Sequence, residues 1–139
     1  MQTTLILLKP DCVTAKNCGE VISRLEKAGF RICGTKMIHL SKEILREHYA
    51  HVADKPFYPE IEQFMQSAPV VAVALAGDDI IDKVREMLGP TDSTQAAKGT
   101  IRGDLGKNKM INVVHASDSQ AAAEVELKRF FKPEELYTY

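Results

Sequence analysis

Continuous apolar runs mark three strands of the chain. Residues 4–8 (Thr-Leu-Ile-Leu-Leu) form one such run, which ends before Pro10, a residue that cannot donate to a sheet ladder. Val70–Ala76 is apolar at both alternating sets of positions, as expected of a central strand covered on both faces. Ile111–Val114 is the last run, and it predicts a strand that leads directly to His115.

A fourth strand and several helices follow from the alternation and spacing of the other hydrophobic residues. The segment from Phe30 to Leu40 predicts a long strand with Phe30, Ile32 and Ile38 on one face. Helical spacing and end signals predict four helices before residue 90. The first has an inner stripe of Val21, Leu25 and Ala28 and ends before Gly29, and the second is capped by Ser41 and reaches Ala50. The third has Pro59 in its first turn and reaches Gln66, and the fourth starts at Asp78 or Asp79, carries Ile81, Val84 and Leu88, and ends at Gly89-Pro90.

The final helix has the clearest start signal. Ser117-x-x-Gln120 fits a capping box, and Ala123, Leu127 and Phe130 then follow at helical spacing. His115 thus lies between a predicted strand and a predicted helix N-terminus, where unpaired N–H groups bind anions and a neutral imidazole is nucleophilic. A lone histidine at a strand end is more often a hydrogen-bonded boundary residue, so the local pattern leaves both interpretations open.

The order of elements predicts the fold class. Pro90–Met110 carries several glycines and little periodicity, which predicts a long functional loop before the last strand. The remaining order fits two split βαβ units in an α/β (α+β) ferredoxin-like sandwich, with helices packed on a four-stranded antiparallel sheet. We expect residues 1–139 to form a single domain. Regulatory ligand-binding modules and RNA-binding domains share this architecture, so the fold alone does not decide the function.

Composition narrows the functional classes. With 45% hydrophobic and 27% charged residues, the chain resembles ordinary globular proteins, and its formal net charge of -1 disfavours a dedicated nucleic-acid binder. No signal peptide is apparent, and the longest apolar run is far shorter than the roughly 20 residues of a membrane span. We therefore expect a cytoplasmic protein without a membrane partner. Cys12, Cys18 and Cys33 are odd in number and form no CxxC pair, which favours reduced thiols.

Three other catalytic or metal motifs are not supported. The chain has no GxxxxGK[ST] loop and no GxGxxG after a strand. His115, Ser117 and Asp118 are too close in sequence at a strand end to align easily as a hydrolase triad, and GxSxG is absent. The remaining histidines show no HExxH spacing, so they are interpreted as ordinary surface or packing residues: His39, His48 and His51.

Short motifs lie at intervals along nearly the whole chain, and the run Asn112–Ser119 is the last of them. The others are Lys9-Pro10-Asp11, Glu47-His48-Tyr49, Lys55-Pro56-Phe57, Ala68-Pro69-Val70-Val71, Leu88-Gly89 and Gly99-Thr100-Ile101-Arg102-Gly103. In their residues and their order these motifs resemble those of the nucleoside diphosphate kinases, and Asn112–Ser119 resembles the active-site signature of that family. Several spaced motifs in one order are more specific than any one of them. One departure is Ala116, where the family usually has glycine.

The resemblance implies a catalytic role for three residues. His115 would accept the γ-phosphoryl group of a nucleoside triphosphate on Nδ1 and pass it to a nucleoside diphosphate, in a ping-pong mechanism that maintains triphosphate pools. Glu126 would orient the imidazole, although a helical glutamate is otherwise usually solvated. Ser117 carries two interpretations, a helix cap and an active-site hydroxyl, which can both hold.

The resemblance also implies a nucleotide site. Lys9, Arg85 and Arg102 would grip the phosphates, although most cations of a chain are merely surface residues. The other roles implied are hydroxyl contacts from Tyr49 and Thr91, a sugar contact from Asn112, and base stacking on Phe57 with Ile61 beside it. An aromatic flanked by prolines is otherwise more often a packing residue. Mg²⁺ is expected through the nucleotide phosphates, with no metal ligands from the protein.

Two functions from other classes compete with this one. A nucleotide-binding regulatory module on the same fold would bind without turnover. A nucleic-acid-binding role would need strongly salt-dependent affinity, which the net charge does not favour. The resemblance further implies a homo-oligomer, and it leaves open whether this is a hexamer or a tetramer.

Overall fold

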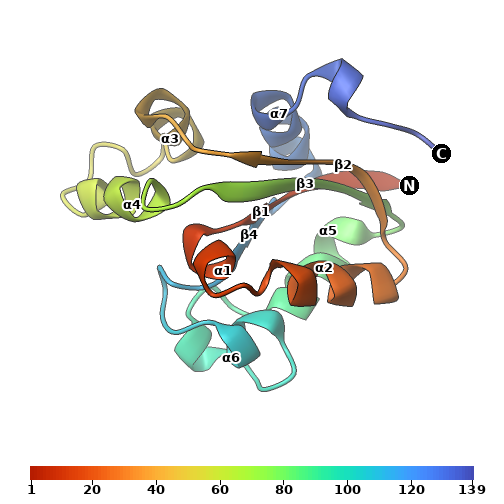
Figure 1. Cartoon of the computed structure of the whole chain (residues 1–139), viewed down its shortest axis with the longest axis horizontal. Helices are drawn as coiled ribbons and strands as arrows, with labels where there is room; N and C mark the ends of the chain where they lie inside the picture. Colours follow the sequence, from red (N-terminus) through yellow and green to blue (C-terminus); the bar gives the residue numbers. More distant parts are fainter.

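A four-stranded antiparallel sheet forms the centre of the molecule. The computed structural model describes all residues 1–139, and its strands are β1 (Gln2–Leu8), β2 (Arg31–Ile38), β3 (Val70–Gly77) and β4 (Val114–Ala116). Their order in the sheet is β2-β3-β1-β4, so β1 and β3 are the inner strands (Figure 1). This is the ferredoxin-like α+β arrangement that the sequence predicts, with Val70–Ala76 in a central strand as expected.

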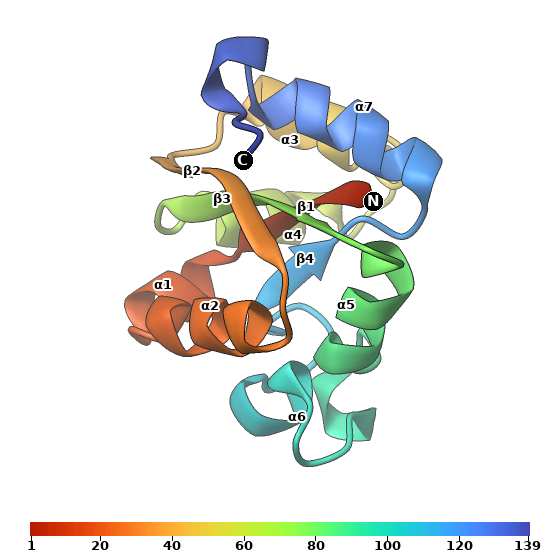
Figure 2. The ribbon, with the colours of Figure 1, turned by 90° about the vertical axis from the view of Figure 1, so that its right-hand side faces the viewer.

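Helices cover both faces of the sheet. In two perpendicular views, α1, α2, α5 and α6 lie on one side, and α3 and α7 lie on the other (Figures 1 and 2). The bounds of the helices are α1 Pro10–Thr14, α2 Cys18–Lys27, α3 Lys42–His48, α4 Tyr58–Met65, α5 Ile80–Leu88, α6 Ile101–Leu105 and α7 Gln120–Phe130, with short 3₁₀ turns η1 (Ser93–Gln95) and η2 (Pro133–Glu135).

The two inner strands divide the core into two layers because successive side chains of a strand point to opposite faces. Along β1, Ile6 and Leu8 pack with α2 and α5, whereas Leu5 and Leu7 pack with α3 and α7. All four side chains are fully buried. An apolar run without alternation is therefore what this strand requires, and the strand is fixed from both sides beneath the elements that carry the candidate site.

The prediction that Phe30, Ile32 and Ile38 lie on one face of β2 was wrong for Ile38. A bulge between Ile32 and Gly34 shifts the register against β3. Since one extra residue exchanges the two faces of a strand, Ile32 packs with the α2 side while Ile38 packs with the α3 and α7 side. Strict alternation across the strand could not reveal the inserted residue.

Other boundaries also differ from the predictions. The last strand begins at Val114, not Ile111, and includes His115. The last helix begins at Gln120, because Ser119 is its cap and accepts a hydrogen bond from the amide of Ala122. The segment from Pro90 to Met110, predicted as a loop, contains η1 and α6. Two helices, α1 and α2, stand where one was predicted, and Ala28, which was predicted on the inner stripe, is exposed. The Ser41 cap is confirmed, but α3 ends at His48.

Two further features of the fold concern the cysteines and the hydropathy of the helices. Cys12, Cys18 and Cys33 are all free thiols. None of the helices combines the length and the apolar character that spanning a bilayer would require.

The C-terminal segment packs along the exposed edge of β2. The amide of Tyr137 donates to the carbonyl of Cys33 at 2.9 Å, and the ammonium of Lys36 lies 2.9 Å from a carboxylate oxygen of Glu135. The hydroxyl of Tyr139 donates to the carbonyl of Ile32 at 2.6 Å. Because an edge strand offers unpaired backbone groups, this segment satisfies part of that edge within the chain.

Gly34→Ala tests this packing. A Cβ at Gly34 would lie 2.8 Å from the carbonyl oxygen of Glu135, so the C-terminal segment must move away from β2. We expect a loss of roughly 1–3 kcal/mol in the free energy of unfolding and faster proteolysis after Phe131. Urea unfolding and limited proteolysis measure the two effects. The control is Gly19→Ala in α2, where no atom lies within 4 Å; it should stabilise by roughly 0.4–1 kcal/mol. Equal effects of the two substitutions would contradict the packing argument.

Candidate active site

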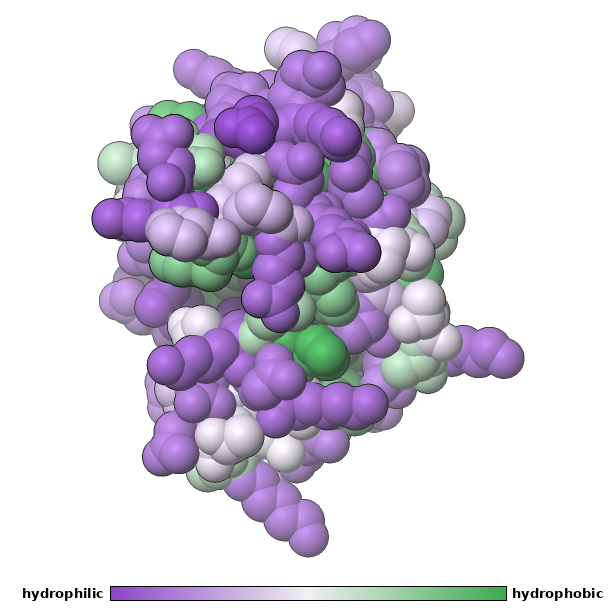
Figure 3. All heavy atoms as spheres, turned by 90° about the vertical axis from the view of Figure 1, so that its left-hand side faces the viewer, coloured by the Kyte–Doolittle hydropathy of each residue, from purple (hydrophilic) through white to green (hydrophobic).

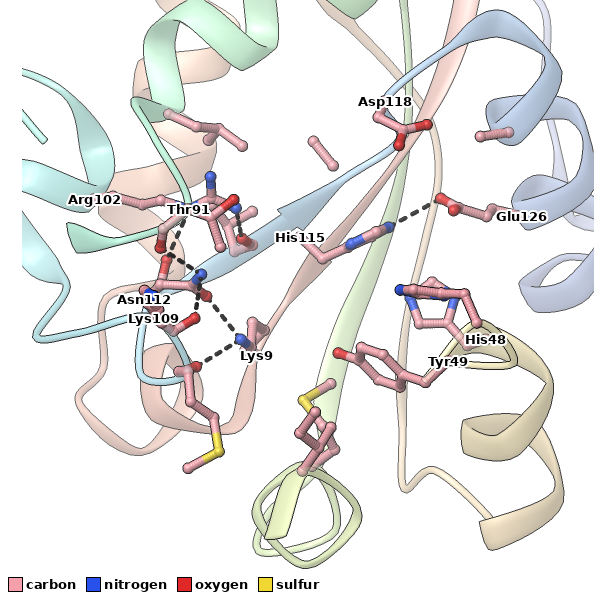
Figure 4. A pocket seen from close by; sticks show the side chains of 18 of the residues that line it. Lys9, His48, Tyr49, Thr91, Arg102, Lys109, Asn112, His115, Asp118 and Glu126 are labelled. Atoms are coloured by element: carbon pink, nitrogen blue, oxygen red, sulfur yellow. Dashed lines mark hydrogen bonds and ion pairs between the residues drawn. The ribbon is translucent and has the colours of Figure 1, made fainter. Parts of the chain in front are cut away.

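A cavity of about 1140 Å³ opens between α3, α4, α7 and the segment from Arg85 to Asn112. Every site residue predicted from the sequence lines it except Ser117: Lys9, Tyr49, Phe57, Ile61, Arg85, Thr91, Arg102, Asn112, His115 and Glu126. Figure 4 shows Lys9, Arg102 and Asn112 on one side of His115, and Glu126 on the other. Figure 3 shows one face of the molecule, which is mainly hydrophilic with several small hydrophobic areas between the hydrophilic side chains.

The backbone before His115 is held in an unusual conformation. Val113 has a φ of +77°, which a β-branched residue rarely adopts, and the amide of Val114 donates to the carbonyl of Asn112 at 2.9 Å in a γ-turn. Asp11 supports the turn by accepting a hydrogen bond from the amide of Val113 at 2.9 Å. His115 then pairs with Leu7 of β1, so its ring projects from a fixed strand and not from a loose helix start.

Glu126 determines which nitrogen of His115 is free. Nε2 of His115 lies 2.9 Å from Oε1 of Glu126, and the hydroxyl of Ser117 donates to the same oxygen at 2.7 Å. Burial alone would raise the pKa of Glu126, but the hydrogen bonds from His115 and Ser117 and the neighbouring positive charge together lower it to about 2. The carboxylate is therefore ionised and accepts the hydrogen bond from Nε2–H, so Nδ1 is the ring nitrogen that Glu126 leaves free.

The prediction that Ser117 caps the last helix was wrong. Its side chain is 1% exposed and donates to Glu126, while the cap of α7 is Ser119. The capping-box pattern was misleading because two serines, Ser117 and Ser119, precede the helix, and only the second is followed by the helical turn that it caps. The hydroxyl of Ser117 instead fixes the carboxylate that orients His115.

Lys9 is a buried cation at the floor of the cavity. Lys9 lies between β1 and α1, as the N-cap residue of α1, and is 6% exposed. Its ammonium donates to the carbonyl of Met110 and to Oδ1 of Asn112, both at 2.7 Å. Burial lowers the pKa of Lys9 to about 8, with nearby Arg102 acting in the same direction and Asp11 opposing both. A surface role for Lys9 is therefore excluded, and the cavity holds a charge that an anion would stabilise.

Arg102 brings a second cation to the same wall. Thr100 caps α6, and the guanidinium of Arg102 then donates to the carbonyls of Gly89 at 3.0 Å and Val114 at 2.6 Å. Burial lowers the pKa of Arg102 to about 10, and the charge of Arg85 adds to this shift. Lys9 and Arg102 repel each other on the same wall of the cavity, so this wall favours anions such as phosphate.

Asn112 links the loop segments around these cations. Its amide nitrogen donates to the carbonyls of Thr91 at 2.9 Å and Lys109 at 3.0 Å, and its oxygen accepts from Lys9. One lone pair of that oxygen is left for a ligand. Thr91 lies exposed beside it, so the two residues form one rim of the cavity.

The opposite rim is apolar and aromatic. Phe57 precedes α4 and is 50% exposed, and Ile61 lies one turn further along that helix. A packing role for Phe57 is therefore not what is observed, since half of the ring is available to a ligand. Tyr49 ends α3, and burial raises its pKa to about 12, so its hydroxyl remains a hydrogen-bond donor.

Sequence reasoning missed three residues around the cavity: His48, Lys109 and Arg129. His48 was interpreted as a surface or packing residue, and it is a buried packing residue; its place against His115, with the two ring centroids 4.6 Å apart, was not foreseen. The sequence feature that could have indicated this place is the motif Glu47-His48-Tyr49, in which His48 directly precedes the predicted site residue Tyr49. Arg129 could not be recognised without the contact that α7 makes with α3.

The cavity offers Mg²⁺ no cage of oxygen ligands. The metal-type cluster formed by His48, His115 and Glu126 has ligand atoms within 4.8 Å of one another, but two of the three are imidazole nitrogens. Mg²⁺ prefers oxygen ligands and commonly binds through substrate phosphates. The residues present thus fit an ion that arrives with a phosphate ligand.

Comparison with known proteins identifies the family. The family model described as nucleoside diphosphate kinase matches residues 2–136. The chain belongs to this family. A curated relative from Rhodopirellula baltica, named nucleoside diphosphate kinase, is 48% identical over all of this chain and 91% of its own length. A relative of the same name from Pyrococcus horikoshii is 45% identical over 99% of this chain and 90% of its own.

Solved structures of the nucleoside diphosphate kinase family have the same fold. The enzyme from Halobacterium salinarum in complex with CDP superimposes with a TM-score of 0.96 at 38% identity, covering 99% of this chain and 92% of that one. The enzyme from Aquifex aeolicus gives a TM-score of 0.93 at 39% identity, covering 97% of this chain and 98% of that one.

Ala116, the departure from the family pattern, is accommodated without strain. It is not among the residues of positive φ, pairs with Ile6, and buries its methyl group in the core. Ala116→Gly should therefore lower the free energy of unfolding by about 1 kcal/mol, through the lost methyl burial and the added freedom of the unfolded chain. Urea unfolding of both proteins measures this. A stability gain in the glycine variant would show that Ala116 strains the site.

Proposed function

We propose that this protein transfers the γ-phosphoryl group of a nucleoside triphosphate to a nucleoside diphosphate by a ping-pong mechanism, with His115 as the nucleophile. The observation that carries this proposal is the orientation of His115. Glu126 holds Nε2, so Nδ1 presents its lone pair in a cavity that also contains Lys9 and Arg102. A nucleophile beside buried cations is what transfer of an anionic group requires.

Each half-reaction moves the phosphoryl group once. The lone pair of His115 Nδ1 attacks the γ-phosphorus, the bond to the bridging oxygen breaks, and the diphosphate leaves with that electron pair. The proton stays on Nε2, where the carboxylate of Glu126 stabilises the positive charge of the phosphorylated ring. In the second half, a terminal oxygen of another diphosphate attacks phosphorus, and the P–N bond breaks to restore the lone pair.

Three cations and a metal ion would balance the phosphate charge. Lys9, Arg85 and Arg102 line one wall of the cavity and are proposed to contact the phosphates. Mg²⁺, when bound through the nucleotide phosphates, supplies further neutralisation of the phosphate oxygens. The buried donors of Lys9 and Arg102 are already oriented by backbone carbonyls, so little reorganisation is needed when charge develops.

The rim residues are proposed to bind the nucleoside. Phe57 and Ile61 provide a stacking face for the base, Asn112 contacts the sugar, and Tyr49 and Thr91 add hydroxyl donors. The complex of the Halobacterium salinarum relative with CDP supports a nucleotide ligand. Every base has a π-face, so stacking without base-specific hydrogen bonds should accept purines and pyrimidines alike.

A regulatory nucleotide-binding module without turnover is the competing proposal. It would need the cations and the stacking face, but not a histidine whose tautomer is fixed by Glu126 and Ser117. The oriented nucleophile therefore favours the enzyme. We further propose a cytoplasmic homo-oligomer, a hexamer or a tetramer, for which light scattering gives the mass. Nucleic acid is not proposed as a main partner.

Labelling with γ-³²P-ATP and Mg²⁺ tests the function. His115 should carry an acid-labile, base-stable phosphate, which is then transferred to an added diphosphate. His115→Gln should lose the label because it lacks the nucleophilic nitrogen. Quantitative peptide mapping is the measurement. Label that persists in His115→Gln, or that lies on Ser117 in the parent, would overturn the mechanism.

The pH profile of kcat/KM tests the role of Lys9. Its pKa of about 8 in the free protein means that the ammonium is charged below this pH and neutral above it. We expect kcat/KM for a triphosphate to fall as pH rises through about 8, since phosphate binding needs the charge. In Lys9→Arg, whose guanidinium stays charged, this limb should vanish even if activity is lower. The same limb in both proteins would assign it to another group.

A further inference from the structure

Arg129 makes an unusual contact behind the proposed nucleophile. It follows Glu126 by three residues in α7, so both side chains share one side of the helix. The Arg129 side chain is 11% exposed, and its NH1 lies 2.8 Å from Nδ1 of His48, at the end of α3. Its Nε is buried and lies 3.4 Å from Oε1 of Glu47, an ion pair without hydrogen-bond geometry to a carboxylate that is mostly exposed. A mostly buried guanidinium paired with a solvent-exposed carboxylate and an imidazole gains little stability from these contacts.

This contact fixes the tautomer of His48. A guanidinium can only donate hydrogen bonds, so Nδ1 of His48 must accept and the ring proton must be on Nε2. Burial lowers the pKa of His48 to about 3, and the positive charges facing it, first from His115 and then from Arg129 and His51, act in the same direction, while Glu126 opposes them. His48 is therefore a neutral imidazole of one tautomer.

His48 in turn forms one wall against His115. Its ring centroid lies 4.6 Å from that of His115 at an interplanar angle of 79°. The ring is packed edge-on against Tyr49 at 5.0 Å and Phe130 at 5.4 Å. Figure 4 shows His48 and Glu126 near one another on the same side of His115. Rotation of His48 would therefore change the surface against which the nucleophile is held.

We propose that Arg129 is a positioning residue that acts on His115 through His48. By accepting from Arg129, His48 keeps one ring orientation and one tautomer, and it confines the His115 ring to the plane in which Glu126 holds Nε2. This role rests on the proposed function, since it concerns the geometry of phosphoryl transfer.

The tautomer of His48 is measured directly by long-range ¹H–¹⁵N NMR of the imidazole rings in the intact protein. We expect the parent to show His48 only as the Nε2–H form at neutral pH. Arg129→Leu removes the donor, so both tautomers should appear. Arg129→Lys, which keeps a cationic donor, should restore most of the Nε2–H form. The control Lys128→Leu removes an exposed cation from the same helix and should leave the spectrum of His48 unchanged.

Single-turnover phosphorylation of His115 by ATP tests the consequence for transfer. Arg129→Leu should slow this step by about tenfold with little change in nucleotide KM, since the substitution disturbs the angle of attack and not the phosphate site. In a His48→Phe background, which keeps a ring but no acceptor nitrogen, Arg129→Leu should cause no further loss. Amide spectra of each variant report whether the fold is intact.

Three results would overturn the proposal: an unchanged His48 tautomer in Arg129→Leu, an equal rate loss in the His48→Phe background, or an equal loss in Lys128→Leu. Failure of the proposed function looks different. If the parent protein is not phosphorylated on His115, the kinetic role of Arg129 is overturned together with the enzyme assignment. If the parent is phosphorylated but the tautomer does not respond to Arg129→Leu, only the positioning role is lost.

Discussion

The hydrogen bond between Glu126 and His115 is the interaction on which the site depends. It joins the last strand to the last helix, and it requires an ionised carboxylate in a partly buried position, which Ser117 helps to stabilise. Burial opposes the ionised form, so the two donors are needed to hold its pKa low. Because the carboxylate of Glu126 accepts the hydrogen bond from Nε2 of His115, the other ring nitrogen, Nδ1, is left free of Glu126. Chemistry at Nδ1 is thus a consequence of what occupies Nε2.

The scaffold keeps that geometry at some cost in free energy. Val113 adopts a left-handed conformation, Lys9 is a buried cation, Arg102 is a partly buried one, and Nε of Arg129 is buried without a hydrogen bond, with only the exposed carboxylate of Glu47 at 3.4 Å. Each of these features is unfavourable in isolation. They are tolerated because β1 and β3 are packed on both faces, so the strands beneath the cavity cannot relax to relieve the strain. Strained and desolvated groups gathered at one cavity are typical of functional sites.

Much of this arrangement could be predicted from sequence, but not its boundaries. Val70–Ala76 was predicted as a central strand because covering on both faces leaves a continuous apolar pattern. The face of Ile38 was not, because a bulge has no clear sequence signal. The spaced motifs predicted residues that the structure brings to one cavity, whereas periodicity alone said nothing of Lys9 meeting Asn112, which is 103 positions away. His48 and Arg129 escaped recognition since their role exists only where α3 meets α7.

The contrast between the whole chain and the cavity explains why net charge was a weak guide to the ligand. The formal charge of -1 is spread over a surface of mixed sign, whereas Lys9, Arg85 and Arg102 converge on one wall. Coulomb interactions are stronger where water is partly excluded, so cations gathered at one cavity wall can favour an anion even in a slightly acidic protein. The depressed pKa values of Lys9 and Arg102 record the same desolvation. A bound phosphate would restore both groups toward their ordinary pKa values, and that reciprocal stabilisation makes an anion, and not a neutral ligand, the natural occupant of this wall.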